Sequence, residues 1–451
     1  MTSRPKLLFV LPSAGGGGAE RASVDLLRGI HRQQFQMTLA LLTRSGRFLQ
    51  QLPDDVPVRD LRGRQSYDIR LVWRLAAVLR RENPDVVFSV LRYTNLITLL
   101  ACRLVNVLPR VLGGAGNRAA VVVNEQNPPS AEFALFGGGR VKGWFLKRLY
   151  PGADRVTAIS AGISRELVSV YGLSPDKVQV IPNPVDLERV TALAAAKLEH
   201  PFYPATPLVL PILPRTQDAV ARTQDAVARA RPQLTAPTNG GMSTGAWVQS
   251  AVAENALWTP SAADQSGLPV LVAVGRLHQQ KGFAHLIRAF SIVRQALPCK
   301  LVILGEGPLR PELENLIASL GLTEDIALPG FQENPYNYIS NSTAFVLSSL
   351  FEGFGNVLVD ALALGVPIIS TRCPVGPEDI ITDGVTGVFV PPADEEALAQ
   401  AILRVLRDDK LRRRLSANGP PRAADFAIER IVSQYEALFE RLSREKSGLE
   451  C

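Results

Sequence analysis

The chain has 451 residues, of which 46% are hydrophobic and 20% are charged, so it is a globular chain of two to three domains that can bury a large core. Its four cysteines have no paired spacing and its four histidines form no ligand cluster, which favours a reducing compartment and excludes a structural zinc site. No stretch of about 20 apolar residues occurs, and residues 1–6 lead directly into a predicted strand rather than a signal sequence. We therefore expect a cytoplasmic protein.

The charge is distributed unevenly along the chain. Residues 1–190 carry 26 Lys and Arg against 15 Asp and Glu, a net charge of +11, whereas the remainder carries −4. A basic N-terminal half suits an anionic partner, and nucleic acid and an anionic membrane surface are both candidates. Scattered arginines in contact with solvent would give the same count, so the charge alone leaves these alternatives open.

Residues 6–190 alternate between strand patterns and helix patterns. The first strand pattern, at 6–12, leads into a glycine-rich turn at 13–18 and then into a helical pattern that begins at Ala19. Further strand patterns begin near residues 37, 84, 120, 155 and 177, and a helix is predicted near 69–83. Such alternation implies a parallel sheet with ligands at the carboxyl ends of its strands. The glycine turn is not the dinucleotide-binding fingerprint, because its consecutive glycines lack the GxGxxG spacing.

Polar residues follow the buried strand predicted at 120–124. Glu125, Gln126 and Asn127 come directly after it. In an open α/β sheet this edge is where the ligand crevice lies. These three residues are therefore candidates for the cleft.

Residues 139–150 form a predicted amphipathic helix. Its apolar stripe consists of Val141, Trp144, Phe145 and Leu149, and its flanking cations are Arg140, Lys142, Lys147 and Arg148. Aromatic side chains beside basic groups suit a lipid headgroup interface. The alternative is a stripe that faces the core with a solvated basic face, and the pattern leaves both open.

The alternation of strand and helix patterns stops between residues 200 and 267. Proline recurs at 201, 204, 207, 211 and 214, and the heptapeptide RTQDAVA occurs twice in tandem from Arg215. Ala, Thr, Ser and Gly dominate the rest. This composition predicts a flexible insertion between two domains.

A second series of strands and helices begins at residue 268. Its first buried strand ends at Gly275, and Arg276 and Lys281 flank the turn before a helix predicted at 284–295. Both cations thus lie where a phosphate would sit against a helix N-terminus. Strand ends follow near residues 304 and 330, and an amphipathic helix is predicted at 427–444.

Residues 345–379 read as strand, loop, helix and strand. Gly353 and Gly355 remove side chains in the loop, so backbone N–H groups and the positive helix end can approach an anion. Glu352 precedes the helix and Asp360 lies about one turn inside it. Carboxylates repel phosphate but accept hydrogen bonds from sugar hydroxyls, so we interpret them as sugar and ribose ligands. The alternative is that the helix macrodipole alone favours acids near this end.

Four motifs in this order resemble glycosyltransferase family 4. They are Gly-Gly-Ala-Glu-Arg at 17–21, Ile-Pro-Asn-Pro-Val-Asp at 181–186, Val-Gly-Arg-Leu with Gln-Lys-Gly-Phe at 274–283, and Glu-Gly-Phe-Gly with Asp-Ala-Leu-Ala-Leu-Gly-Val-Pro at 352–367. The resemblance implies the GT-B fold, an α/β architecture in which two Rossmann-like parallel-sheet domains face each other across a cleft. The domains expected are an acceptor-side domain at 1–199, the insertion at 200–267, a nucleotide-sugar-binding domain at 268–424 and a C-terminal helix at 425–451 that can pack back on the first domain.

The resemblance also implies an activity. Members transfer a sugar from a nucleotide diphosphate donor to an acceptor hydroxyl with retention at the anomeric carbon. The donor would be a UDP-sugar or GDP-sugar, with no metal and no other cofactor, and the chain contains no Asp-x-Asp motif. The partners implied are the nucleotide-sugar donor, a glycan or lipid-linked acceptor, and the anionic surface on the cytoplasmic face of a membrane. No nucleic-acid partner is implied. The alternatives are a sugar-nucleotide 2-epimerase and a catalytically inactive protein that binds nucleotide sugars.

The family's site residues can be carried over position by position. Arg276 and Lys281 match cations that neutralise the leaving diphosphate, and fixed cations with a helix terminus can stabilise its charge without a metal. Glu352 matches the first acid of the family's E-x7-E motif, which faces the donor sugar. Asp360 matches the second, which holds the ribose, but it is one methylene shorter than Glu. The remaining positions are Gly17, Gly18 and Gly355 among the donor- or nucleotide-binding residues, Asn356 and Val357 at the phosphates, Gly330 and Phe331 at the base, and Glu125 and Asn127 on the acceptor side.

Overall fold

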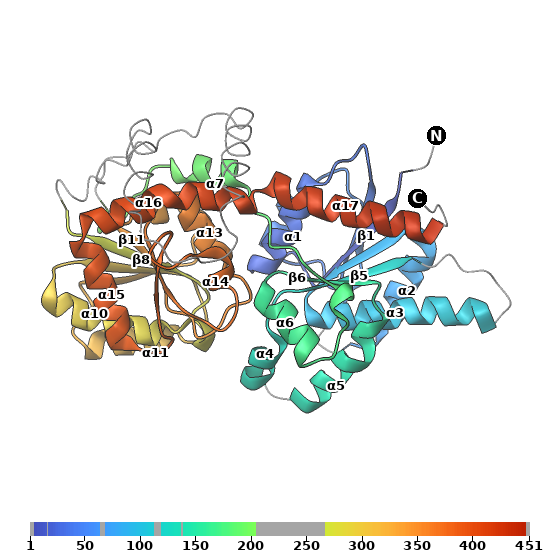
Figure 1. Ribbon diagram of the computed structural model, residues 1–451, viewed down its shortest axis with the longest axis horizontal. Helices are drawn as coiled ribbons and strands as arrows, with labels where there is room; N and C mark the ends of the chain where they lie inside the picture. The colour runs from blue at the N-terminus through green and yellow to red at the C-terminus, as the bar shows by residue number, and fades with distance from the viewer. Residues whose placement is uncertain are drawn as a thin grey trace, which may run out of the picture.

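A computed structural model describes residues 4–15, 17–63, 68–111, 119–136, 139–203 and 267–447 (Figure 1). The chain forms two α/β units that lie side by side. The first holds a seven-stranded sheet in the order β3-β2-β1-β4-β5-β6-β7, and the second a six-stranded sheet in the order β10-β9-β8-β11-β12-β13. All recorded strand pairs are parallel. The expected pair of parallel-sheet units is therefore confirmed.

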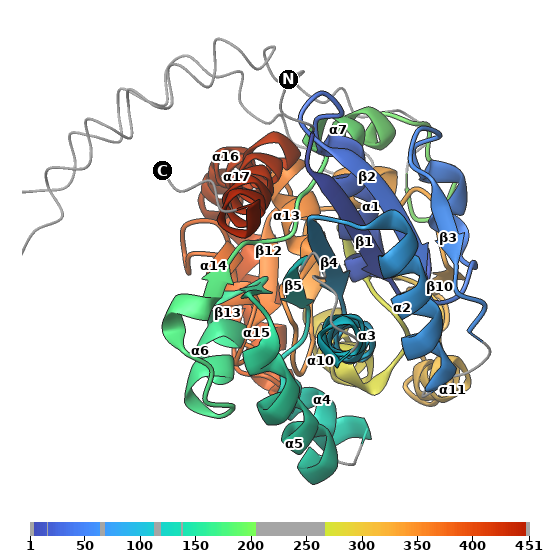
Figure 2. The same cartoon turned by 90° about the vertical axis from the view of Figure 1, so that its right-hand side faces the viewer.

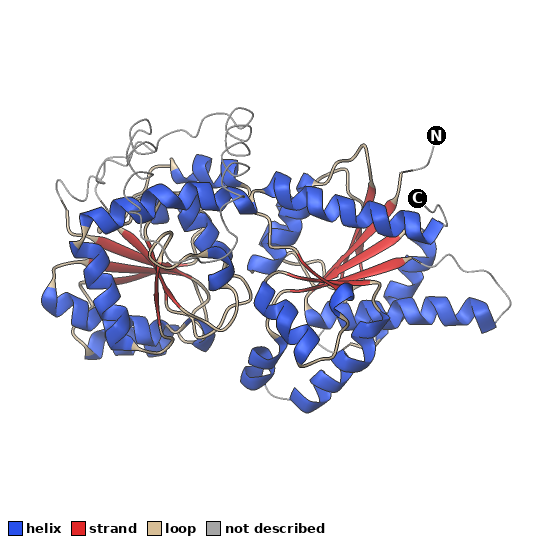
Figure 3. Ribbon diagram, in the orientation of Figure 1, coloured by secondary structure: helices blue, strands red, loops and turns tan. Residues whose placement is uncertain are grey.

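The first unit runs from β1 to β7. Its strands are β1 (Lys6–Leu11), β2 (Gln36–Leu41), β3 (Val58–Asp60), β4 (Val86–Val90), β5 (Ala120–Glu125), β6 (Arg155–Ala158) and β7 (Val178–Val180). Its helices are α1 (Gly18–Gly29), α2 (Arg70–Glu82), α3 (Arg92–Val111), α4 (Pro129–Phe136), α5 (Gly139–Leu149) and α6 (Ala161–Ser169), whereas α7 (Leu187–Ala194) packs on the second unit. The central strands are almost continuously apolar because helices cover both faces of the sheet (Figure 3).

The second unit repeats this layering. Its strands are β8 (Val270–Val274), β9 (Lys300–Leu304), β10 (Ile326–Gly330), β11 (Ala344–Leu347), β12 (Ile368–Thr371) and β13 (Val388–Val390). Its helices are α10 (Phe283–Ala296), α11 (Arg310–Ser319), α12 (Tyr336–Ser340), α13 (Asn356–Ala363), α14 (Pro377–Ile380), α15 (Glu395–Arg407) and α16 (Asp409–Ala423). Both units thus present the carboxyl ends of parallel strands, which is the edge where α/β proteins bind ligands.

The last helix, α17 (Ile428–Ser447), returns to the first unit and lies across it (Figure 1). Phe439 is fully buried, and its ring centroid lies 6.1 Å from that of Phe9 and 5.6 Å from that of Phe88. The two connections between the units run side by side, because Val185 and Ala427 form a parallel bridge. The first core therefore includes residues from both ends of the chain.

The residues of the predicted apolar stripe on α5 differ in their burial. Leu149 is buried, whereas the exposed fractions of Val141, Trp144 and Phe145 are 62%, 58% and 40%. Figure 2 shows α5 projecting with α4 beyond the first sheet. The aromatic residues therefore do not face the core. Within the described residues, no helix is both long enough and apolar enough to cross a membrane.

Most of the predicted insertion, residues 204–266, lies outside the described residues. The segment before it is anchored to the second unit, because Tyr203 is buried and its hydroxyl lies 2.9 Å from Ser342 Oγ. The next described segment enters the same sheet at Val270, whose N–H donates to Thr343 Oγ1 at 3.2 Å. The chain therefore leaves and re-enters the second unit at neighbouring positions.

Candidate active site

The loop that follows β11 packs directly against the first unit. A Cβ atom added to Gly353 would lie 1.8 Å from the carbonyl oxygen of Gln126, which follows β5. Only glycine permits this approach. At the start of α13, Asn356 donates from Nδ2 to the Gly18 carbonyl and accepts at Oδ1 from Asn183, both at 3.0 Å. The carboxyl ends of the two sheets therefore meet at one cleft.

Lys281 and Glu352 lie together on the second unit's side of this cleft. Lys281 Nζ is 2.6 Å from Glu352 Oε1, and the Ser349 hydroxyl donates to the same oxygen at 2.6 Å. Only 5% of Glu352 is exposed. The Lys281 stem lies across the end of β8, since a Cβ at Gly275 would lie 3.1 Å from its Cδ. Lys281 and Glu352, which the sequence assigned to different parts of the donor, thus form one ion pair in which only the acid is buried.

Arg276 lies in the turn that follows β8, but its surroundings differ from those of Lys281. Its side chain is exposed, and no described residue makes a side-chain hydrogen bond or an ion pair with it. The turn around it is held by the backbone, where His278 N–H donates to the Arg276 carbonyl at 2.7 Å. Among the described residues, no carboxylate therefore neutralises the charge of Arg276.

The N-terminus of α13 has no side-chain cap. Gly355 is its N-cap residue and has a φ of +97°, a conformation that favours glycine. The N–H groups of Asn356 and Val357, which open the helix, have no intrahelical partner, whereas the N–H of Leu358 donates to the Gly355 carbonyl at 2.8 Å. Uncapped N–H groups and the positive helix end form a site that attracts anions.

Asp360 is held across the cleft by Arg21 of α1. Arg21 donates from Nη1 to Asp360 Oδ2 at 3.1 Å and from Nη2 to Oδ1 at 3.3 Å. Burial works to lower the pKa of the Arg21 guanidinium, but the carboxylates of Asp360 and Asp25 outweigh it and raise that pKa above its ordinary value. Asp25 lies 3.6 Å from Arg21 Nε, and burial raises the pKa of its carboxyl. The residue expected to hold the ribose is thus engaged by a residue of the other unit.

Gly330 and Phe331 end β10 at the same edge. Gly330 has a φ of +85° and accepts a hydrogen bond from Gly305 N–H at 2.9 Å. The ring of Phe331 is 40% exposed, and the guanidinium carbon of Arg47 lies 3.8 Å from its centroid. Arg47 begins the short 3-10 helix η1 (Arg47–Gln51) of the first unit. The expected base-binding residue therefore also contacts an arginine from across the cleft.

The residues expected on the acceptor side contact a buried network of the first unit. Glu125 is 1% exposed, receives a hydrogen bond from Arg92 Nη2 at 2.8 Å and another from the Tyr150 hydroxyl at 2.7 Å. Burial raises the pKa of its carboxyl, although Arg92 and Tyr150 act in the opposite direction. The Asn127 carbonyl accepts from Arg92 at 3.1 Å. Gln126, rather than Glu125, contacts the second unit.

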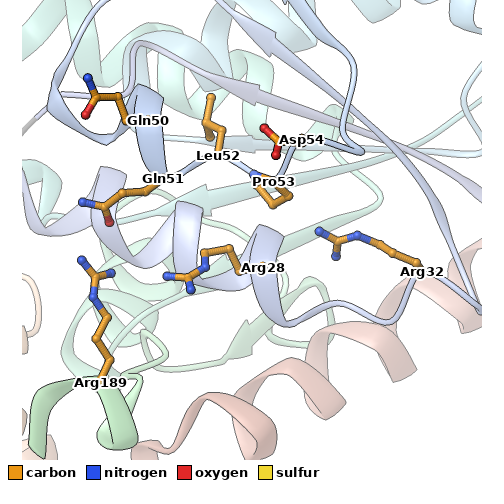
Figure 4. A pocket seen from close by; sticks show the side chains of 8 residues that line it. All are labelled: Arg28, Arg32, Gln50, Gln51, Leu52, Pro53, Asp54 and Arg189. Carbon is orange, nitrogen blue, oxygen red and sulfur yellow. The ribbon is translucent and has the colours of Figure 1, made fainter. Parts of the chain in front are cut away.

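A separate polar pocket of about 580 Å³ lies at the C-terminal end of α1 (Figure 4). Its lining residues are Arg28, Arg32, Gln50, Gln51, Leu52, Pro53, Asp54 and Arg189. None of the site residues predicted from the sequence lines this pocket. The chemistry is therefore better assigned to the cleft, where the cations, the acids and the uncapped helix meet.

Residues 16–189 match the model described as Glycosyltransferase Family 4, and residues 258–422 match the model described as Glycosyl transferases group 1. The chain belongs to glycosyltransferase family 4. This family 4 chain is 27% identical over 432 residues to the N-acetylgalactosamine-N,N'-diacetylbacillosaminyl-diphospho-undecaprenol 4-alpha-N-acetylgalactosaminyltransferase of Campylobacter jejuni, covering 93% of the chain and 95% of the relative.

Other similarities agree with this family. The lipopolysaccharide core biosynthesis glycosyltransferase LpsD of Rhizobium meliloti is 38% identical over 173 residues, which are 38% of the chain and 49% of that relative. The chain thus spans about half the length of several curated relatives that it matches. Anabaena HepE in complex with UDP and glucose has a TM-score of 0.68 at 18% identity, covering 97% of the chain and all of HepE. The fold is therefore GT-B, and the relatives support glycosyl transfer rather than epimerisation or binding without turnover.

Sequence reasoning missed three residues that complete the cleft. Arg21 stands in the Gly-Gly-Ala-Glu-Arg motif, which was a usable signal, and Asn183 stands in the Ile-Pro-Asn-Pro-Val-Asp motif. Arg47 follows a strand in a loop with no periodic pattern, so no local signal identifies it.

Proposed function

We propose that the protein transfers a sugar from a UDP-sugar or GDP-sugar to an acceptor hydroxyl, with retention at the anomeric carbon. The observation that carries this proposal is the meeting of Lys281, Glu352 and the uncapped N-terminus of α13 at the carboxyl ends of β8 and β11. The Anabaena HepE structures, which contain UDP and UDP-glucose, support a nucleotide-sugar donor for this fold. The second unit, residues 268–424, would hold this donor, and the first, residues 1–199, the acceptor.

The leaving diphosphate needs compensating positive charge as the glycosidic bond breaks. Arg276, whose charge is not balanced by a described carboxylate, and Lys281 supply it from one side. The N–H groups that open α13 at Asn356 and Val357 supply it from the other, and Gly355 lets the backbone come close. Fixed donors of this kind stabilise developing charge without reorganisation, so the proposed reaction requires no metal ion and no other cofactor.

Glu352 is assigned to the donor sugar. Its carboxylate is fixed by Lys281 and Ser349, each 2.6 Å away, so it has a defined position beside the diphosphate cation. A carboxylate offers about four lone-pair sites, which leaves acceptors for sugar hydroxyls after these two bonds. Lys281 would then bridge the sugar ligand and the phosphate.

The anomeric configuration is retained because the acceptor oxygen attacks the anomeric carbon from the same face that the diphosphate leaves. The bond between the acceptor oxygen and the anomeric carbon forms as the bond from that carbon to the phosphate oxygen breaks. The acceptor proton passes to the departing phosphate oxygen, so the reaction needs no dedicated basic side chain. The catalytic contribution of the protein is then orientation and charge stabilisation.

The nucleoside and the acceptor complete the assignment. Asp360 would accept hydrogen bonds from the ribose, Gly330 and Phe331 would contact the base, and Gly17 and Gly18 would line the phosphate side of the cleft from α1. On the acceptor side, buried Glu125 would act through Arg92, which also binds the carbonyl of Asn127.

A lipid-linked acceptor is the proposed substrate class, in surface polysaccharide or lipid-linked oligosaccharide synthesis. The name of the Campylobacter relative specifies a diphospho-undecaprenol acceptor. The helix α5 exposes Trp144 and Phe145 beside Lys147 and Arg148, a combination suited to an anionic headgroup layer. The protein would then be cytoplasmic and peripheral at the membrane's inner face.

The decisive experiment incubates the protein with a panel of UDP-sugars and GDP-sugars, with and without a polyprenyl-diphosphate-linked acceptor, in the presence of a chelator. We expect nucleoside diphosphate release that depends on the acceptor, and a product whose anomeric configuration by NMR matches that of the donor. An epimerised nucleotide sugar formed without acceptor, or binding without release, would overturn the proposal. Activity that disappears with the chelator would overturn the metal-free mechanism alone.

A further inference from the structure

Two arginines of the first unit contact the two residues that the proposed function assigns to the nucleoside. Arg21, from α1, bonds both carboxylate oxygens of Asp360, and Arg47, from η1, covers the ring of Phe331. The two contacts involve different elements and different chemistry, one an ion pair and the other a cation–π contact. Both join the two units across the cleft.

The Arg21 contact leaves Asp360 little access to any ligand. The side chain of Asp360 is 4% exposed and that of Arg21 is 18% exposed, so the pair is largely shielded from water. The guanidinium also lies 5.3 Å from the centroid of the Tyr336 ring. A ribose hydroxyl can reach the carboxylate only when Arg21 gives up at least part of its contact or the units move apart.

The Arg47 contact presents the same obstacle to a base. At 3.8 Å from the ring centroid, the guanidinium is at stacking distance, which leaves no room for a base between the two groups. Because Arg47 belongs to the first unit, it covers the face of Phe331 that looks across the cleft. Stacking on that face requires Arg47 to move away.

We infer that Arg21 and Arg47 form a latch. Arg21 holds Asp360 and Arg47 covers Phe331, the two residues of the second unit assigned to the nucleoside. The ribose and the base of the donor must displace the two arginines in order to bind. The inference rests on the proposed function, because that function assigns Asp360 and Phe331 to the nucleoside. It also gives Arg21 of the Gly-Gly-Ala-Glu-Arg motif a role that the transfer mechanism does not supply. Donor binding and the contact between the units are thereby coupled.

Substituting a latch residue should affect nucleotide affinity in the opposite direction from substituting a residue that binds the nucleotide. The apparent dissociation constant equals the intrinsic constant divided by the fraction of molecules that are competent to bind. Weakening either latch contact raises that fraction, so substitution should tighten nucleotide binding. A residue that merely supported the fold or oriented Asp360 would weaken binding or leave it unchanged when removed.

The test is calorimetric titration of the full chain and of the Arg47→Gln and Arg21→Gln variants with UDP and GDP. For the nucleotide that the parent binds, we expect each variant to bind about 3- to 10-fold more tightly. The double variant should show roughly the product of the two factors, because the sites are separate. Arg28→Gln, also on α1, and Arg44→Gln, just before η1, serve as controls and should bind like the parent.

Dideoxynucleotides separate the two contacts. With 2′,3′-dideoxy-UDP or 2′,3′-dideoxy-GDP no hydroxyl competes for Asp360, so the gain from Arg21→Gln should vanish while the gain from Arg47→Gln remains. If Arg21→Gln unfolds because Asp25 and Asp360 lose their partner, the Arg21→Gln/Asp25→Asn variant restores the charge balance. Equal or weaker binding by Arg47→Gln and by the Arg21 variant would overturn the latch and leave the transferase intact. A parent that binds neither UDP nor GDP would overturn the proposed function, and the latch with it.

Discussion

The two cations at the end of β8 have the same expected role but different surroundings. Lys281 is paired with buried Glu352, whereas Arg276 is exposed and unpaired among the described residues. Removing a partner from a buried charge costs stability, but removing an exposed, unpaired cation does not. The two positions therefore separate charge stabilisation in catalysis from stability of the fold.

Replacing Arg276 or Lys281 by Ala should lower turnover by about 100-fold or more, because each removes charge stabilisation that grows as the diphosphate leaves. Arg276→Ala should leave the melting temperature unchanged. Lys281→Ala should also destabilise the fold, by about 1–3 kcal/mol, because Glu352 loses its partner. Steady-state kinetics and thermal unfolding measure both effects, and Arg404→Ala, an exposed arginine on α15, is the matched control. Near-parental kinetics in both variants would refute the diphosphate assignment.

Replacing Glu352 by Gln should abolish transfer while nucleotide binding survives, since this carboxylate is assigned to the sugar. The amide keeps the shape but offers fewer acceptors to sugar hydroxyls. We expect a loss of about 100-fold or more in kcat with a dissociation constant for free UDP or GDP close to the parent's. Glu312→Gln, on the exposed side of α11, is the control. A parallel loss of nucleotide affinity would show that Glu352 contacts the nucleotide instead.

At the scale of single residues, the sequence predicts which charged residues lie near the carboxyl ends of the strands, but not which residues they contact. Glu352 and Lys281 are 71 positions apart, and only the parallel order of β8 and β11 brings them to 2.6 Å. Arg21 and Asp360 are 339 positions apart and belong to different units, so no local pattern links them. Glu125 was predicted to follow its strand, but it is the last residue of β5, and its burial there makes it the partner of Arg92.

At the scale of elements, hydrophobic periodicity is a local property and identifies the long helices well. The predicted helix at 284–295 corresponds to α10 at Phe283–Ala296, and that near 69–83 to α2 at Arg70–Glu82. The short edge strand β3, at Val58–Asp60, has no fully buried residue and gives no such signal. What periodicity could not decide is which side of α5 faces the core, because that depends on neighbours distant in sequence.

The helix α5 should dock the protein on anionic membranes. The rings of Trp144 and Phe145 lie edge to face at 5.1 Å, and they can insert shallowly while the cations add about 1 kcal/mol each near an anionic surface. Co-sedimentation with vesicles should rise with the fraction of anionic lipid and fall with salt. The Lys142/Lys147/Arg148→Glu variant should bind markedly less while it still folds and binds nucleotide.

The control for this charge reversal is Arg28/Arg44/Arg80→Glu, which changes the net charge equally on the same unit but leaves α5 intact. If both triple variants lose binding to the same extent, general attraction by the basic unit accounts for docking and α5 has no special part. If the parent does not bind anionic vesicles at all, a soluble acceptor becomes the better interpretation.

At the scale of the whole molecule, the two units are joined by segments that cross side by side. The chain passes from the first unit to the second at Val185 and returns at Ala427, where the two form a parallel bridge. The fold was predictable in outline because each unit's strands alternate with helices. The resemblance already suggested that a C-terminal helix at 425–451 packs back on the first domain, but the residues of α17 that contact the first sheet, Phe439 and Tyr435, required the structure.

The predicted insertion should be dispensable for folding and catalysis. Tyr203 contacts Ser342 and Val270 contacts Thr343, so the segment begins and ends at two consecutive residues of the second unit. A short Gly/Ser linker in place of residues 205–265 therefore has to connect only two neighbouring positions of the second unit. The entropy cost of closing this shorter loop differs little from that of the longer segment, because the cost grows only logarithmically with loop length. Neither unit's sheet nor either crossing is altered. We expect the shortened protein to match the parent in circular dichroism, within a few degrees in melting temperature and in its donor KM. A shortened protein that does not fold, or that folds but loses turnover, would show that the segment contributes to the structure or to the site.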